Sequence, residues 1–174
     1  WATTAAGGTG TLGNPITLTY SYVPDGVSIP GSNGEATSNN TLTATMNARF
    51  NGNTALWKSK MAACFARWGV LTGINFVEVS DDGAPFPDSA GSNTPGAIRG
   101  DIRIAAHPID GGSNVLAYTF FPDVGDMVFD TAEGWGDVMS VNRWLASGRP
   151  GLRKSFVRRS SLVASETSPC SFPG

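Results

Sequence analysis

The chain begins its ordered pattern with ITLTYSYV, Ile16–Val23, in which apolar and polar side chains alternate. Ile16, Leu18, Tyr20 and Tyr22 fall on one side and the threonines and serine on the other, which predicts a half-buried strand. The next segment, Pro24–Asn40, is rich in Gly, Pro, Ser and Asn, and it predicts a loop. The pattern of Thr41–Phe50 is weak and fits either a loop or a short ordered stretch.

A helix is predicted over Asn53–Gly73, because apolar residues recur there at steps of three and four. Asn53 is suited to cap the helix at its N-terminus, and Gly73 is suited to end it. The residues of the predicted apolar face are Trp57, Met61, Cys64, Phe65, Trp68 and Leu71.

The second half of the chain predicts further strands separated by polar loops. The loops are Asp81–Gly100 and Ile109–Asn114. The strands are Ile74–Val79, Asp101–Ala106, Val115–Phe121 and Asp126–Asp130. A helix near the start followed by consecutive strands indicates the α+β class, with a twisted, mixed sheet of about five strands and the long helix packed on one face.

Composition adds a domain count and a compartment. A chain of 174 residues is long enough for one domain with a real core. No apolar run approaches the length needed to span a membrane. Abundant Gly, Ser, Thr and Asn, with only three lysines, favour a secreted β-rich domain, and the opening WATTAAGGTGTLG is typical of a processed start. We expect a flexible segment over 1–15, a domain over 16–137 and a basic tail over 138–174.

Acidic residues gather near the last two predicted strands, in IDGGSN and in GDMVFDTAEGW. Carboxylates, flexible glycines and exposed carbonyls at close spacing are what calcium takes as ligands. The residues concerned are Asp110, Gly111, Ser113, Asp126, Asp130 and Glu133, with Asp101 at the start of another strand. The alternative is that these are ordinary solvated turn residues, because Asp, Gly, Ser and Asn are common in turns.

Four segments together resemble the matrixins, the zinc metalloendopeptidases that include the matrix metalloproteases. They are LWKSKMAACFARWGVLTGINFVEV, GDIRIAAH, IDGGSNVLAYTFF and GDMVFDTAEGW, and they follow the family's order from about Ile16 to Trp135. The resemblance implies the N-terminal subdomain of the zincin (metzincin) fold, a secreted location and proteolysis of peptide bonds.

The resemblance also implies two calcium sites and a peptide-binding edge. The first site would use the side chains of Asp110, Asp130 and Glu133 with backbone carbonyls near Gly111, Ser113 and Val115. The second would use Asp101 and Asp126 with carbonyls of the Pro122–Gly125 turn. The Val115–Phe121 strand, through Leu116, Ala117 and Tyr118, would bind an extended peptide as a further strand.

The chain departs from the family at both zinc sites. Tyr118 and Val128 stand where two histidines of a structural zinc site are expected, and His107 in HPID fits a hydrogen-bonded loop residue better than a ligand. The catalytic pattern H-E-x-x-H-x-x-G-x-x-H requires three histidines, and this chain has one. No catalytic residue is therefore predicted, and the zinc expected for the family lacks its ligands.

The charge balance changes abruptly after Trp135. Residues 138–174 contain one carboxylate, Glu166, and the basic residues Arg143, Arg149, Arg153, Lys154, Arg158 and Arg159. Such a tail fits a solvated segment, a membrane-surface or nucleic-acid segment, or the product of a shifted reading frame or truncated gene.

The sequence favours an inactive or truncated matrixin-type chain that keeps its calcium sites and is a monomer. The alternative is a non-catalytic, calcium-stabilised extracellular binding module. A nucleic-acid binder and a hydrolase that pairs His107 with a serine are less favoured.

Overall fold

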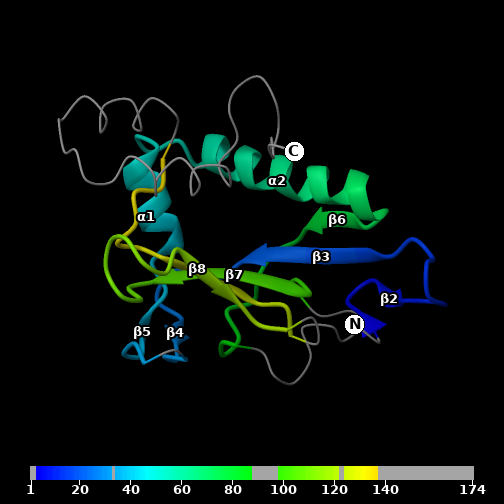
Figure 1. The fold of residues 1–174 in the computed structure, drawn as a ribbon, viewed down its shortest axis with the longest axis horizontal. Coiled ribbons are helices and arrows are strands. Elements are labelled where there is room, and N and C mark those ends of the chain that lie inside the picture. The colour runs from blue at the N-terminus through cyan, green and yellow to red at the C-terminus, as the bar shows by residue number, and fades with distance from the viewer. Residues whose placement is uncertain (1–2, 33, 88–97, 122–123, 137–174) are drawn as a thin grey trace.

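The computed structural model describes residues 3–32, 34–87, 98–121 and 124–136. Its centre is a five-stranded mixed sheet in the order β6-β3-β7-β9-β8 (Figure 1), which confirms the α+β class. The β8–β9 pair is antiparallel, whereas the other neighbours are parallel. The strands are β3 (Thr17–Tyr22), β6 (Asn75–Glu78), β7 (Ile102–His107), β8 (Ala117–Thr119) and β9 (Met127–Asp130).

Two helices precede the second strand of this sheet. In α2 (Thr54–Thr72) the Asn53 side chain accepts the Leu56 N–H at 3.0 Å, and Gly73 ends the helix in the left-handed region at φ 74°. The segment Thr41–Phe50, for which the sequence pattern was weak, contains the second helix, α1 (Leu42–Arg49). Leu42 and Met46, one turn apart, are the residues that α1 buries.

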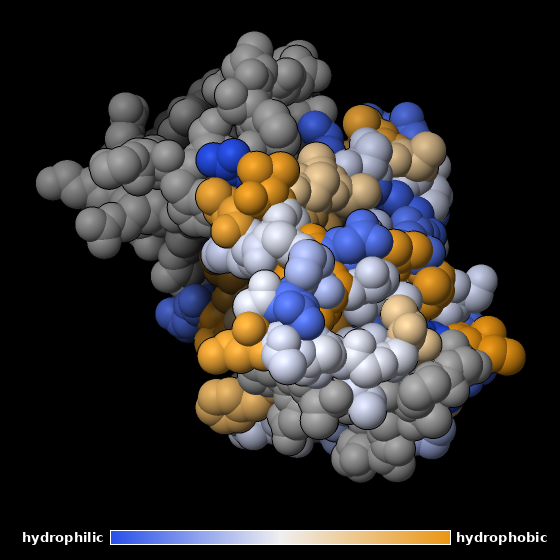
Figure 2. Space-filling model, turned by 90° about the vertical axis from the view of Figure 1, so that its right-hand side faces the viewer, coloured by the Kyte–Doolittle hydropathy of each residue, from blue (hydrophilic) through white to orange (hydrophobic). Residues whose placement is uncertain are grey.

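The main core lies between the helices and one face of the sheet. Its buried residues are Leu18, Tyr20, Leu42, Met46, Phe50, Trp57, Ile102, Ile104 and Ala106. The predicted apolar face of α2 is only partly buried, because Trp57 is 1% exposed while Trp68 and Leu71 are 49% and 56% exposed. Figure 2 views the side of the molecule at the right of Figure 1, and there apolar areas are separated by polar ones.

The opposite face of the sheet is also covered, which the sequence did not predict. Segment Pro24–Asn40, expected to be a loop, contains the hairpin strands β4 (Ser28–Ile29) and β5 (Ser38–Asn39). Below the sheet, Val23, Ile29, Phe86, Ala105 and Val128 form a second apolar cluster. Strand β7 is therefore buried at all six positions, polar ones included, instead of showing one polar face.

The first residues also carry structure. Strands β1 (Thr3–Thr4) and β2 (Gly7–Gly8) pair as a small hairpin within the segment expected to be flexible. The Ala5 N–H between them donates to the Asp101 carboxylate at 2.6 Å, which fastens the hairpin to the sheet. The described part of the chain holds no helix long and apolar enough to cross a membrane. The predicted basic tail, 138–174, lies outside the described residues.

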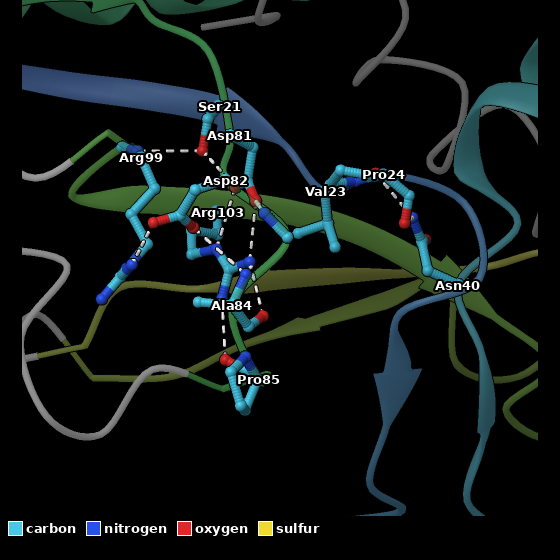
Figure 3. A network of polar contacts seen from close by, with 12 residues as sticks. Ser21, Val23, Pro24, Asn40, Asp81, Asp82, Ala84, Pro85, Arg99 and Arg103 are labelled. Carbon is cyan, nitrogen blue, oxygen red and sulfur yellow. Dashed lines mark hydrogen bonds and ion pairs between the residues drawn. The ribbon is translucent and has the colours of Figure 1, made fainter.

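Arg103 of β7 holds the loop after β6 against the lower face. Its guanidinium donates to both Asp81 carboxylate oxygens, at 2.9 and 2.8 Å, and to the carbonyls of Pro85 and Ala84, each at 2.9 Å (Figure 3). Arg103 and Asp81 are almost completely buried, with side chains 0% and 1% exposed. These bonds use four of the five guanidinium N–H groups, which offsets much of the cost of burying the charge.

Candidate calcium loops and peptide-binding edge

The two loops of the first predicted calcium site lie side by side. Asp130, the last residue of β9, is fully buried and accepts N–H groups from Ile109 at 3.2 Å and Ala132 at 2.8 Å. Its second oxygen accepts the Asp110 N–H at 3.4 Å. The contacts from Ile109 and Asp110 thus join the end of β9 to the loop that follows β7, while the contact from Ala132 closes the turn after β9.

Glu133 and Asp110 complete this loop pair. Glu133 accepts the Ser113 N–H at 2.8 Å, and Asp110 accepts the Val115 N–H at 3.3 Å. Gly111 and Ser113 have positive φ angles of 86° and 118°, so the backbone turns sharply between them. The predicted ligand residues therefore belong to one compact region, although their carboxylates face backbone N–H groups.

The charge of this region is largely uncompensated by protein cations. Among the residues that the structure describes, no basic side chain forms an ion pair with Asp110, Asp130 or Glu133. Arg49 approaches Glu133, but it donates to the backbone carbonyl at 3.0 Å. The donors are all hard oxygens, which suits calcium better than a softer metal.

The second predicted site is less converged. Asp101 is fully buried and accepts from the Thr19 N–H at 2.7 Å and the Thr19 hydroxyl at 2.8 Å. Asp126, also buried, accepts the Arg103 N–H at 2.9 Å on the β9 side of β7. Within the described ranges, no three His, Cys, Asp or Glu side chains form a ready metal-binding group. Both calcium sites stay predictions, and part of the Pro122–Gly125 turn lies outside the described residues.

Strand β8 forms one edge of the sheet, as a peptide-binding strand must. The Asp130 N–H donates to the Leu116 carbonyl at 2.9 Å, and the Phe120 N–H donates to the Asp126 carbonyl at 2.9 Å. Because backbone groups alternate in direction along a strand, those of Ala117 and Thr119 point away from β9. Within the described part of the chain, no strand pairs with this edge of β8, so Ala117 and Thr119 direct their N–H and C=O groups away from the sheet.

The residues at the expected structural zinc positions have other surroundings. Val128 is fully buried in the lower apolar cluster, and Tyr118 packs against that cluster from β8. His107 was expected in a loop, and that expectation is wrong, because His107 is the last residue of β7 and is fully buried. Its neighbours Glu35 and Ser38 lie in the Pro24–Asn40 segment, which was expected to be a loop, so these contacts were not predicted.

Comparison with models of known protein families and with curated proteins finds no match for this chain.

Proposed function

We propose that this protein is a secreted, matrixin-like module without hydrolytic activity, which binds extended peptides along β8 and is stabilised by calcium. The observation that carries the proposal is the open edge at β8, where Ala117 and Thr119 direct their backbone groups away from the sheet. An extended peptide adds to such an edge through main-chain hydrogen bonds.

The calcium loops support the same edge. Strand β8 directly follows the 109–115 loop, and Val115 is held by the Asp110 carboxylate. Asp130 donates its backbone N–H to Leu116, next to the strand. A cation bound among Asp110, Asp130 and Glu133 would offset their repulsion and fix the start of β8, and so it would order the peptide-binding edge.

The absence of hydrolysis is proposed from the sequence. A zinc-activated water in this class of enzyme needs several histidine ligands and a glutamate base. The chain contains one histidine, His107, and its imidazole is buried below the sheet.

The first test removes a backbone N–H of β8 that points away from the sheet. Ala117→Pro removes an N–H that β9 does not use, and proline is tolerated on edge strands for that reason. We expect casein-derived peptides to bind this variant at least about tenfold more weakly, as measured by fluorescence anisotropy. Ala117→Thr, which keeps the N–H, should bind as the unaltered protein does. Equal binding by both variants, with unchanged circular dichroism, would contradict the edge proposal.

The second test concerns calcium. At about 100 times its dissociation constant, a ligand of the native state stabilises it by about 2.7 kcal/mol, which raises the melting temperature by several degrees. We expect this difference in melting temperature between calcium and EDTA for the unaltered protein. The difference should be smaller for Glu133→Gln than for the control Glu78→Gln, because Glu78 lies on β6, the other edge strand of the sheet. A melting temperature unaffected by EDTA would reject the calcium sites. Cleavage of casein that a chelator stops would reject the absence of hydrolysis.

A further inference from the structure

His107 and Glu35 meet below the sheet in an arrangement that no hydrogen bond explains. The His107 Nε2 atom lies 3.6 Å from Glu35 Oε1, and the two side chains are 0% and 2% exposed. Nε2 has no hydrogen-bond partner. A nitrogen–oxygen hydrogen bond is normally about 2.7–3.2 Å long, so these atoms are too far apart for one.

The separation fits two ligands of one metal ion. A tetrahedral ion with ligand bonds of about 2.1 Å holds two ligand atoms roughly 3.4 Å apart. The distance between Nε2 and Oε1 is close to this value. An imidazole and a carboxylate around a shared ion would also remove the unfavourable contact of a buried nitrogen that lacks a partner.

The other ring nitrogen is held as a metal-bound histidine requires. His107 Nδ1 lies 3.0 Å from the Ser38 hydroxyl, so Nδ1–H can donate there and leave the Nε2 lone pair facing Glu35. Burial lowers the pKa of His107 despite the opposing effect of Glu35 and Asp130, which keeps the imidazole neutral at neutral pH. A neutral imidazole is the form that binds metal.

Tyr118 supplies a third candidate ligand. Its hydroxyl is buried and makes no hydrogen bond of normal geometry, although Ser32 and Glu35 are near enough to influence its pKa. Burial is the largest effect and raises that pKa. Tyr118 of β8 packs against the lower apolar cluster, which includes Ile29 of β4, and Glu35 of the β4–β5 hairpin is near enough to influence its pKa, so both residues approach the same buried space.

The hairpin fixes the position of Glu35. The Ser32 N–H donates to Glu35 Oε1 at 3.1 Å. A Cβ atom added at Gly31 would lie 1.9 Å from the Glu35 carbonyl oxygen, so the backbone passes very close to itself here. The carboxylate is thus placed by a tight turn and not by a freely rotating loop.

We propose that His107 Nε2, Glu35 and the Tyr118 hydroxyl form a site for a divalent transition ion of the zinc class. Ser38 orients the imidazole, and a fourth position is left for a small ligand such as water. This site is separate from the calcium loops in its chemistry, because one ligand is an imidazole, which suits zinc and its neighbours in the periodic table better than calcium. The proposal does not depend on peptide binding or on the calcium sites.

The test uses the full, untagged chain from which metal has been removed with a chelator. Zinc is then titrated into it in the presence of excess calcium, and binding is measured by isothermal titration calorimetry. We expect one zinc ion per chain. Glu35→Gln, which keeps the acceptor for Ser32, should weaken zinc binding at least about tenfold, and Tyr118→Phe should weaken it by a smaller factor. Glu78→Gln and Tyr22→Phe are the matched controls, since Tyr22 also has a buried hydroxyl without a partner, and both should bind zinc normally.

Cobalt(II) in place of zinc distinguishes the possible ligands. Visible bands of a tetrahedral nitrogen–oxygen site, lost in Glu35→Gln, would support the proposal. Thiolate-to-cobalt charge-transfer bands would assign the ion to a cysteine and overturn it. Zinc binding that is absent, or equal in Glu35→Gln and Glu78→Gln when both melt as the unaltered chain does, would also overturn it. Gly31→Ala should weaken zinc binding as well, because it displaces Glu35.

Discussion

Asn40 shows how a single buried amide joins distant parts of this fold. Its side-chain nitrogen donates to the carbonyls of Val23 at 2.7 Å and Pro24 at 3.1 Å. Its side-chain oxygen accepts the N–H groups of Leu42 at 3.2 Å and Ala106 at 2.8 Å. The amide has two donors and two acceptor positions, and all four are used. Asn40 therefore ties the end of β3 to the start of α1 and to β7.

We predict that Asn40→Asp destabilises the protein strongly, although the two side chains have nearly the same shape. The new oxygen would face two carbonyls: that of Val23 would lose the donor from Asn40, and that of Pro24 would keep only the long contact from the Val27 N–H at 3.4 Å. We expect a cost of about 1–3 kcal/mol or more. Urea unfolding followed by tryptophan fluorescence measures the change. A loss below about 0.5 kcal/mol would show that the carbonyls find other donors.

The contacts of Asn40 could not be predicted from the sequence. Its segment has the composition of a loop, and its partners Leu42 and Ala106 belong to elements whose positions relative to Asn40 depend on the whole fold. Thr19 and Ser21 illustrate the same limit. They were expected on a solvated strand face but are buried, because other segments cover this face, and their hydroxyls bond Asp101 and Asp81.

Among the elements, the ends of α2 and α1 were predictable to different degrees. Asn53 and Gly73 act on their own neighbours in sequence, so local rules located both ends of α2. The α1 segment has no side-chain cap at Thr41 and no acidic residue in its first turn. Asp25, from another part of the chain, accepts the Thr43 and Ala44 N–H groups at 2.9 and 2.8 Å instead. A helix capped from a distance leaves little local signal.

The cap of α2 gives a prediction at this scale. Asn53→Ala should lower the free energy of unfolding by about 1 kcal/mol, because the Leu56 N–H loses its acceptor. Asn53→Ser should keep most of the stability. Chemical unfolding of the two variants in parallel gives the comparison, and equal stability of both would mean that water replaces the cap without loss.

For the whole molecule, neighbouring segments were easier to place than distant ones. The 109–115 loop and the 130–133 turn adjoin strands that follow closely in sequence, and Asp130 and Glu133 do contact that loop. The metal ligation predicted for them is not tested by these contacts. Glu35 and His107 lie far apart along the chain, and only the packing of the β4–β5 hairpin under the sheet brings them together.

The buried pair of Asp81 and Arg103 makes the stability of the whole fold depend on pH. Burial opposes ionisation of Asp81, but hydrogen bonds from Arg103, Ser21 and Gly83 outweigh it and lower its pKa. Because the pKa of Asp81 is lower in the folded than in the unfolded state, its ionised form stabilises the fold at pH values above the unfolded pKa, which is about 4. This stability is lost as the pH falls through the folded pKa.

We therefore predict that the difference in unfolding free energy between the unaltered protein and Asp81→Asn shrinks as the pH falls from 6 toward about 3. Asp82→Asn serves as the control, because Asp82 pairs with Arg99 in a partly exposed ion pair and should change the stability little at any pH. Urea midpoints over this range measure both. A difference for Asp81→Asn that is constant with pH would contradict the assignment.

The hydrogen bonds between Thr19 and Asp101 join residues that are 82 positions apart in the chain. During translation, β3 emerges from the ribosome long before β7, which is its partner at the centre of the sheet. The helices and β6 can cover one face and one edge of β3 earlier, but its other edge stays unpaired until residues 102–107 have been made. Contacts this distant slow folding and favour the help of chaperones during synthesis.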